Sequence, residues 1–263
     1  MPELPEVEAV AARLRPLVQG VRIVSCGQFR PTTAKGADSA IGRVVERIDR
    51  RGKHILVRLD GGVFLRVHLK MTGNLTVIPD ARLRASTVRA WFEFEDGRAM
   101  VLDDPRALGR VSFHHDGEEA ELFSELGPEP FCAEFTFEHL LRRMRLSRKP
   151  VKPFLMDQRA VAGLGNIYAA EALFEARIDP RREARRISCG RISRLHGAIV
   201  GILRSALDSA LRAYSEPGGF TEGENFPSAV YGREGEPCLA CGRAVKRIAQ
   251  AGRSTYFCSA CQR

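Results

Sequence analysis

The sequence lacks any run of eighteen uncharged apolar residues, and it lacks a basic segment followed by an apolar stretch near its first residue. A helix that crosses a membrane needs about 20 apolar residues, and a secretory leader needs both of the missing features. We therefore expect no membrane insertion, no membrane partner and no secretion, which places the protein in the cytoplasm.

Acidic residues are too few to balance the basic ones. The 263 residues include 41 Lys and Arg against 32 Asp and Glu, so the formal net charge is +9 and the pI is near 9.5. A surface field of this sign attracts polyanions, of which nucleic acid is the commonest. Basic residues are densest at 142–149 and 181–194, where they either bind an anionic partner or form solvated helix faces.

Cysteine is scarce until the end of the chain. Cys26, Cys132 and Cys189 are scattered and are expected to be ordinary small side chains. The other four occur as two pairs, Cys238-x2-Cys241 and Cys258-x2-Cys261, with sixteen residues between the pairs. In a reducing compartment two such pairs supply four thiolates to one tetrahedral Zn²⁺, an interpretation that we prefer to two disulfides.

The residues between the cysteine pairs are expected to form a β-hairpin. Residues 243–248 and 254–257 have the composition of strands, and Gln250-Ala251-Gly252-Arg253 has that of a turn. The sequence therefore predicts a hairpin that zinc holds together and that carries a basic tip.

The first half of the chain predicts antiparallel β-structure. With 44% hydrophobic residues the chain can bury a full core, and its length suits two domains. Between Val21 and about His115, short apolar segments alternate with turn signals such as Asp96-Gly97, which is typical of a sandwich or barrel. The predicted strands are 21–26, 44–50, 54–59, 63–69, 88–95 and 98–102.

Helical spacing replaces this pattern after the Gly127-Pro128-Glu129-Pro130 cluster, which we interpret as a linker. The expected helices cover 137–144, a short segment around 154–155, 167–174 and 187–211. A glycine turn at Gly163-Leu164-Gly165 opens the third of these at Asn166. Such a turn exposes backbone N–H groups that bind phosphate, although a plain connection between helices uses glycine as well.

The first eight residues, Met1-Pro2-Glu3-Leu4-Pro5-Glu6-Val7-Glu8, allow two interpretations. Pro5 and Glu6 suit the start of a helix. Pro2 is small enough to permit removal of Met1, which would leave a secondary amine at the chain end. An α-amino group has a pKa near about 8, so a fraction is neutral and nucleophilic at neutral pH. Its attack on an aldehyde-level carbon would give an iminium ion.

Three further residues are unusual choices for strand packing. Lys53 follows Gly52 where the chain turns into an apolar strand, so it either points at a phosphate or developing alkoxide, or is a solvated turn lysine. Met71, beside a glycine turn, either fills the core or wedges between bases. Arg106 either bonds a base edge or pairs with the adjacent carboxylates.

In their combined order these motifs resemble the bacterial formamidopyrimidine-DNA glycosylase and endonuclease VIII family over essentially the whole chain. The start of the chain and residues 68–73 look more like the formamidopyrimidine branch. The segments that carry the resemblance are 2–8, 51–53, 68–73, 104–106, 126–130, 152–157, 163–169, 231–233 and 235–237, followed by the four cysteines.

The resemblance implies an α+β fold and a monomer that binds damaged double-stranded DNA in a cleft. Residues 1–126 would form a catalytic domain with an N-terminal helix and an antiparallel β-sandwich. Residues 127–230 would form a helix-two-turn-helix domain, and 231–263 the zinc hairpin. Such a protein would be associated with the nucleoid.

The resemblance also implies a bifunctional DNA glycosylase and abasic-site lyase that excises oxidised bases. Pro2 would attack C1′ of the damaged nucleotide, Glu3 would manage protons, Glu6 would support the site and Lys53 would act as a general acid. Elimination of the 3′ and then the 5′ phosphate would follow from the iminium ion. The remaining implied residues contact DNA: Lys152, Asn166 and Arg253 would bind phosphates that flank the lesion, and Met71, Arg106 and Leu108 would fill the space of the extruded base. His68 is a further implied DNA-binding residue.

Two positions depart from the family pattern. Leu108 stands where the family usually has phenylalanine, and a leucine stacks less on a base. In the formamidopyrimidine branch a glycine-pair segment rich in Thr or Ser begins the lesion-covering loop, whereas the stretch 209–230 begins Ser-Ala-Leu-Arg-Ala-Tyr and its glycine pair, Gly218-Gly219, arrives later. Oxidised pyrimidines or other lesions therefore stay open as substrates. A non-catalytic binder of damaged DNA, or a zinc-ribbon module with an unrelated front half, are the alternatives from other classes.

Overall fold

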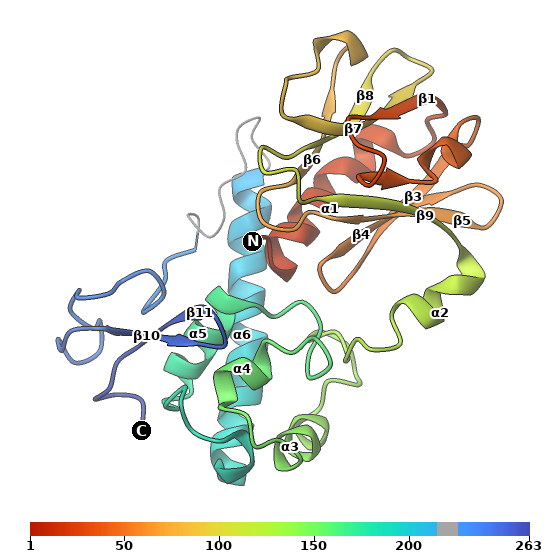
Figure 1. The fold of residues 1–263 in the computed structure, drawn as a ribbon. Helices are drawn as coiled ribbons and strands as arrows, with labels where there is room; N and C mark the ends of the chain where they lie inside the picture. Colours follow the sequence, from red (N-terminus) through yellow and green to blue (C-terminus); the bar gives the residue numbers. More distant parts are fainter. Residues whose placement is uncertain (215–225) are drawn as a thin grey trace. The chain divides into compact units, whose positions relative to one another are not determined.

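The computed structural model describes residues 1–214 and 226–263 (Figure 1). The helices are α1 (Leu4–Val18), α2 (Glu119–Leu122), α3 (Phe137–Arg145), α4 (Val151–Leu155), α5 (Asn166–Glu175) and α6 (Cys189–Tyr214). The strands are β1 (Ile23–Gln28), β2 (Ala34–Lys35), β3 (Val45–Arg51), β4 (His54–Leu59), β5 (Val63–His68), β6 (Asn74–Ile78), β7 (Val88–Phe94), β8 (Ala99–Asp103), β9 (Arg110–His115), β10 (Lys246–Gln250) and β11 (Arg253–Phe257).

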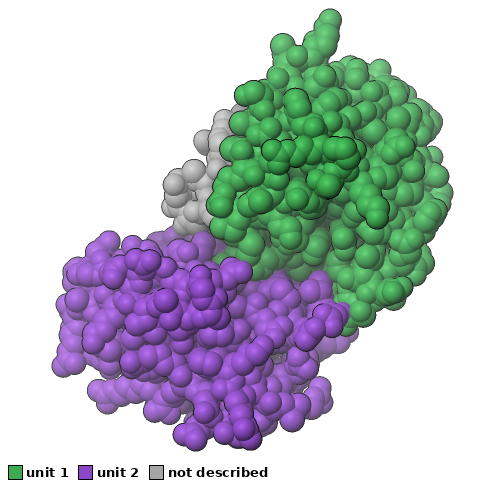
Figure 2. Space-filling view, in the orientation of Figure 1, with its two compact units in different colours: residues 1–124, 210–222 green, residues 125–209, 223–263 purple. Residues whose placement is uncertain are grey.

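The chain divides into two compact units, coloured separately in Figure 2. The first unit contains residues 1–124 and 210–222, and the second contains 125–209 and 223–263. The last residues of α6 thus belong to the first unit, where Ala210 and Tyr214 join the core. The expected division into domains 1–126, 127–230 and 231–263 stays a prediction.

Two sheets form the first unit. The four-stranded sheet has the order β1-β7-β8-β6, and the five-stranded sheet has the order β2-β9-β5-β4-β3. All pairings are antiparallel except that of β2 with β9. Val57 and Leu65 of one sheet share a core with Phe92 and Met100 of the other. The predicted antiparallel β-structure is confirmed. Strands β2, β6 and β9 were absent from the six predicted strands.

Helix α1 adds its apolar face to the same core. Leu4, Val7 and Leu14 are almost fully buried, as their helical spacing predicts. The helix begins with a capping box, in which the Glu3 side chain accepts from the backbone of the first turn and the Glu6 side chain accepts from Glu3. The chain start is therefore a helix start, with Pro5 in the first turn.

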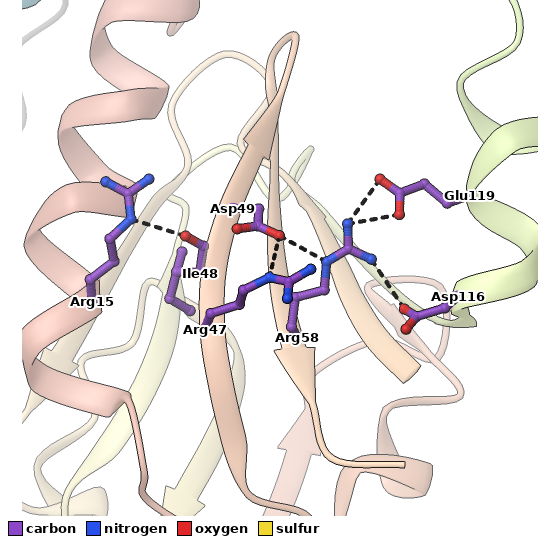
Figure 3. A network of polar contacts seen from close by, with 7 residues as sticks. All are labelled: Arg15, Arg47, Ile48, Asp49, Arg58, Asp116 and Glu119. Carbon is purple, nitrogen blue, oxygen red and sulfur yellow. Dashed lines mark hydrogen bonds and ion pairs between the residues drawn. The ribbon is translucent and has the colours of Figure 1, made fainter. Parts of the chain in front are cut away.

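The buried side chain of Arg58 bonds the segment that contains Asp116 and Glu119 to the five-stranded sheet (Figure 3). Arg58 of β4 donates from Nε to Asp49 of β3 at 3.0 Å, from Nη1 to Asp116 at 3.1 Å and from Nη2 to Glu119 at 2.8 Å. Asp116 and Glu119 lie at the start of the α2 region, which precedes the boundary between the units. Arg58 thus fixes the segment through which the chain leaves the first unit.

The second unit is built on helices α3 to α6 and a two-stranded hairpin. Leu140, Leu155, Leu173 and Leu203 contribute to one core from four helices. In the hairpin, Ala251 and Gly252 have φ values of 48° and 72°, as a two-residue type I′ turn requires. Strand β10 begins at Lys246 rather than at the predicted residue 243, because residues 243–245 pair with 235–238 instead.

No helix in the described part of the chain is both long and apolar enough to cross a membrane.

Candidate functional site

Pro2 and Glu3 lie at the buried start of α1. Glu3 is 1% exposed and Glu6 is 3% exposed. The backbone N–H of Glu3 donates to Glu6 Oε2 at 2.8 Å, so the Glu6 carboxylate fixes the residue that follows Pro2. A salt bridge of 2.9 Å between Glu8 Oε2 and Arg50 Nε joins the helix to the end of β3. These two contacts thus fix the first two turns of α1, directly after Pro2.

Lys53 occupies the turn between β3 and β4. Gly52 has a φ of 57°, a conformation that favours glycine, and it leads the chain into Lys53. Lys53 is only 7% exposed. The interpretation as a solvated turn lysine is therefore wrong, because the side chain is buried.

His54 and His68 form an aromatic pair beside Lys53. Their ring centroids are 4.6 Å apart at an interplanar angle of 87°, and Phe123 contacts the other side of His54 at 5.4 Å. Burial and the nearby positive charges lower the pKa of His54 to about 3 and that of His68 to about 4. The Lys70 backbone N–H donates to His68 Nδ1 at 2.9 Å. Both imidazoles are therefore neutral at neutral pH.

We expect the first unit to lose stability as the pH falls below about 6.5. The two pKa values are near 6.5 in the unfolded chain and near 3 and 4 when folded, so between these values the unfolded chain binds protons that the native state does not. At pH 5 the loss would reach up to about 2 kcal/mol for each histidine. Thermal unfolding followed by fluorescence of the single tryptophan, Trp91 in β7, measures this change.

A matched pair of variants isolates the histidine contribution. His54→Phe should flatten the pH dependence between about pH 7 and 5, because it removes one titrating ring and keeps the ring contacts. His115→Gln, at an exposed position, should leave the wild-type slope. Equal slopes for all three proteins would contradict the assignment.

Met71 and Leu108 lie on two neighbouring loops and are both 38% exposed. Arg106 is exposed on the second loop, where its backbone N–H donates to Asp104 Oδ1 at 3.2 Å and no ion pair of its side chain occurs within the described residues. The expected role of Met71 in core filling is thus not supported. The two loops present the three predicted wedge residues to solvent.

Asp104 organises both loops and was missed in the sequence. It is fully buried, and its Oδ2 accepts from the backbone N–H groups of Leu108 at 2.6 Å and Gly109 at 2.7 Å. Its Oδ1 accepts from the Thr72 hydroxyl, which follows Met71. A buried acceptor with several donors is costly to remove, so this carboxylate couples the positions of Met71 and Leu108. A carboxylate that precedes Pro105 in a turn was the available signal.

Lys152 and Asn166 come together in the second unit. Lys152 is fully buried, and its ammonium donates to Asn166 Oδ1 at 2.6 Å, to the Ser254 carbonyl at 2.8 Å and to Thr255 Oγ1 at 3.0 Å. These bonds join α4, the start of α5 and strand β11. A cavity of about 190 Å³ is lined by Lys152 and by the exposed Arg253 at the hairpin tip. Lys152 therefore holds both Asn166 and the hairpin strand that begins at Arg253.

Glu171 is a second residue that the sequence interpretation missed. Its carboxylate is 2% exposed and accepts from the backbone N–H groups of Ala229, Val230 and Tyr231 at 2.7 to 3.0 Å. Burial raises the pKa of this carboxyl group. The three bonds anchor the chain shortly after residues 215–225. Half of the predicted lesion-covering stretch 209–230, residues 215–225, lies outside the described residues, and residues 209–214 belong to α6.

The four cysteines of the last segment converge as their spacing predicts. The ligand atoms of Cys238, Cys241, Cys258 and Cys261 all lie within 4.8 Å of one another. The Sγ atoms of Cys238 and Cys261 are 3.9 Å apart, and those of Cys241 and Cys258 are 3.5 Å apart. Tetrahedral zinc with Zn–S bonds of about 2.3 Å requires about 3.8 Å between sulfurs. The donor set fits one structural Zn²⁺ and not disulfides, whose S–S bonds are about 2.05 Å.

Three family models match consecutive parts of the chain. "Formamidopyrimidine-DNA glycosylase N-terminal domain" matches residues 1–111, "Formamidopyrimidine-DNA glycosylase H2TH domain" matches 126–215, and "Zinc finger found in FPG and IleRS" matches 235–263. The second match confirms the predicted helix-two-turn-helix domain type, and the third agrees with the four-cysteine zinc site.

Relatives align with the chain from end to end. A formamidopyrimidine-DNA glycosylase of Thermus thermophilus is 43% identical over 269 residues, which cover 100% of this chain and 98% of the relative. That of Chloroflexus aurantiacus is 40% identical over 273 residues, with the same coverage.

Solved structures agree with this alignment. The crystal structure of the MutM (Fpg) protein of Thermus thermophilus has a TM-score of 0.89 at 42% identity, covering 99% of this chain and 98% of that one. A complex between a Lactococcus lactis Fpg mutant and a Fapy-dG containing DNA has a TM-score of 0.91 at 32% identity, covering 99% of each chain.

Proposed function

The chain belongs to the formamidopyrimidine-DNA glycosylase family and is a DNA glycosylase, and from that premise we propose that it excises oxidised purines from double-stranded DNA and then nicks the strand. The observation that carries the proposal is the full-length similarity to structures solved with Fapy-dG and carbocyclic 8-oxo-G containing DNA. The buried, capped start of α1 supports catalysis by the chain end. The protein would act as a monomer.

The proposed nucleophile is the secondary amine of Pro2 after removal of Met1. Its lone pair attacks C1′ of the damaged nucleotide, the C1′–N bond breaks and the base leaves with that electron pair and a proton. The amine loses its own proton, the C1′–O4′ bond then breaks with the electron pair going to O4′, which takes up a proton, and the nitrogen lone pair forms the C1′=N⁺ iminium ion. This ion acidifies the C2′ hydrogen. Loss of this proton drives departure of the 3′ phosphate, and a second elimination releases the 5′ phosphate. Amine covalent catalysis divides one difficult step into easier ones.

Proton transfer is assigned to Glu3 and Lys53. Glu3 follows the amine directly, so its carboxylate is placed to exchange protons at the sugar as the ring opens. Lys53 is proposed to bind a phosphate and to protonate a leaving group from its buried turn. Glu6 is a positioning residue, because it bonds the Glu3 backbone N–H rather than the substrate.

The exposed loop residues are assigned to base extrusion. Extrusion of a base costs a few kcal/mol of stacking and pairing. Met71 and Leu108 present apolar side chains that can occupy the vacated space, and Arg106 can bond the unpaired partner base. Asp104 fixes the positions of the Met71 and Leu108 loops relative to each other. Leu108 offers less stacking area than an aromatic ring would, so we expect the side chain at position 108 to discriminate only weakly between bases.

Phosphate binding is assigned to His68, Asn166 and Arg253, and Lys152 is assigned to the support of Asn166 and the hairpin. Neutral His68 can donate from Nε2, because its Nδ1 already accepts a hydrogen bond. Asn166 is the first residue of α5, and the backbone N–H groups at the start of a helix can bind an anion such as a phosphate. The Lys152 ammonium is enclosed by protein acceptors, so its contribution is to hold Asn166 and the hairpin and to add positive charge beneath them.

Excision measured across oligonucleotides tests the proposal. Duplexes would carry an oxidised purine, a ring-opened purine or an oxidised pyrimidine, each opposite all four bases. We expect the purine lesions to be released fastest, with a nicked strand as product. Faster release of pyrimidines would favour the alternative substrate class, which the late position of Gly218-Gly219 in the stretch 209–230 motivates. Binding without release would indicate a damage-binding protein.

Removal of zinc is expected to weaken DNA binding and to leave the first unit folded. The four thiolates hold the base of the hairpin that carries Arg253, and structural zinc sites supply folding free energy. Chelation should lower the affinity for an abasic-site duplex at least as much as Arg253→Gln does. Unfolding of the first unit, followed by Trp91 fluorescence, should stay unchanged. Undiminished affinity after verified zinc loss would exclude a role for the hairpin.

A further inference from the structure

The positive charge of the chain is concentrated in two segments of the second unit. Residues 142–149 contain five Arg or Lys and no acidic residue, and residues 179–194 contain six Arg and two acidic residues. Together the two segments carry a net charge of +9, which equals the formal net charge of the whole chain. The charges of all other residues therefore cancel in sum, and these two segments hold the excess of positive charge.

The two segments lie side by side although residues 150–178 separate them in sequence. The Val151 N–H donates to the Arg182 carbonyl at 2.7 Å, the Ala184 N–H to the Lys149 carbonyl at 3.0 Å and the Arg185 N–H to the Ser147 carbonyl at 3.1 Å. Arg145 Nη1 donates to the Ile187 carbonyl at 2.9 Å. Seven exposed basic residues between 142 and 186 form what we call the basic surface: Arg142, Arg145, Arg148, Lys149, Arg181, Arg182 and Arg186.

Few carboxylates neutralise the basic surface. Glu183 pairs with Arg185 and Arg186, Asp179 pairs with Arg181, and Asp157 pairs with Lys149. Arg142, Arg148 and Arg182 make no side-chain ion pair with any described residue. Unpaired like charges repel one another in the folded state, and an anionic partner relieves that repulsion. Charge complementarity therefore favours a polyanion over a neutral partner.

The basic surface continues into the proposed phosphate site at the hairpin. Asp157 lines both the cavity that contains Lys152 and Arg253 and a neighbouring groove of about 490 Å³ that contains Arg148 and Lys149. Gln250 Nε2 of the hairpin donates to the Pro180 carbonyl at 3.3 Å, next to Arg181. A duplex that reaches Arg253 can therefore extend its backbone over the basic surface without leaving the second unit.

We propose that the basic surface binds the phosphates of undamaged duplex DNA that flanks the lesion, independently of its sequence. The proposal rests on the proposed function, because it assumes that the chain acts on DNA. Backbone contacts of this kind supply most non-specific affinity and allow a protein to slide and hop along DNA. The basic surface would thus serve the search for lesions rather than the chemistry.

The test compares two triple variants with the same loss of charge. One carries Arg142→Gln, Arg148→Gln and Arg182→Gln on the basic surface. The matched control carries Arg30→Gln, Lys35→Gln and Arg82→Gln, all exposed in the first unit. Affinity for an undamaged duplex of about 30 base pairs is measured between about 50 and 200 mM KCl. Borohydride trapping of an abasic-site duplex, at saturating full-length enzyme, reports the chemistry separately.

The surface variant should lose between about 2 and 3 in the slope of log affinity against log salt, since each lost phosphate contact contributes about 0.9. The control should keep its slope, and Arg→Lys at the same three surface positions should restore it. Equal slopes for the two Gln variants would overturn the proposal. A loss of slope that occurs only with a single-stranded RNA of equal length would also overturn the proposal, and it would indicate an RNA-binding surface.

The two proposals fail in distinguishable ways. If the wild type forms no adduct with abasic DNA while the surface variant loses its slope, the catalytic assignment is wrong and the surface stands. If trapping is normal and the slopes are equal, the surface assignment alone is wrong.

Discussion

Blocking the amine of Pro2 is expected to abolish strand nicking at abasic sites. An uncleaved N-terminal tag converts this amine to an amide, whose nitrogen has no available lone pair for attack on C1′. Loss of a nucleophile that acts through a covalent intermediate typically costs at least about a thousandfold in rate. Single-turnover nicking of a labelled abasic duplex measures the effect.

The same tag at the C-terminus provides the control, because it adds equal mass and still allows removal of Met1, which leaves the amine of Pro2 free. Affinity for the abasic duplex should fall less than about tenfold in the N-terminally tagged protein if only the covalent step is lost. Nicking at the wild-type rate with a verified N-terminal tag would show that another group is the nucleophile.

Glu3→Gln is expected to slow base excision by about a hundred- to ten-thousandfold, the range typical of a lost general acid or base. Glutamine keeps the acceptor that the capping box uses and has nearly the same volume, so the helix start should remain intact. Excision of an oxidised purine under single-turnover conditions measures the loss.

Glu46→Gln serves as the matched control, since Glu46 is an exposed carboxylate on β3 of the same unit. It should excise at the wild-type rate. Equal thermal stability of both variants, followed by Trp91 fluorescence, would exclude unfolding as the cause. An unimpaired Glu3→Gln protein would remove proton transfer from this residue.

Local patterns in the sequence were sufficient for several features of the fold and site. The start of α1 follows from Pro5 and Glu6, which suit the first turn of a helix. The convergence of Cys238 and Cys258 follows from two C-x2-C pairs. Strand β4 begins and ends where its apolar run predicts. In each case the deciding residues are close in sequence or belong to a ligand set with known spacing.

Several of the features that were missed depend on long-range contacts. Asp104 bonds Thr72 across 32 residues, and Glu171 bonds Ala229 across 58 residues. A buried carboxylate cannot be recognised until its backbone donors are placed. Strand β6 is a local signal that was overlooked, since Thr76, Val77 and Ile78 favour strands. Strand β9 is harder to recognise, because Arg110–His115 mixes polar and apolar residues and owes its place to pairing with β5.

Borohydride trapping on an abasic-site duplex, followed by mass spectrometry of the cross-linked peptide, identifies the nucleophile. Reduction of the iminium ion would fix the sugar to the attacking nitrogen. We expect one adduct, on the N-terminal peptide, with Met1 absent and the sugar on the nitrogen of Pro2. No adduct under conditions where the strand is nicked, or an adduct on a side chain such as that of Lys53, would contradict it.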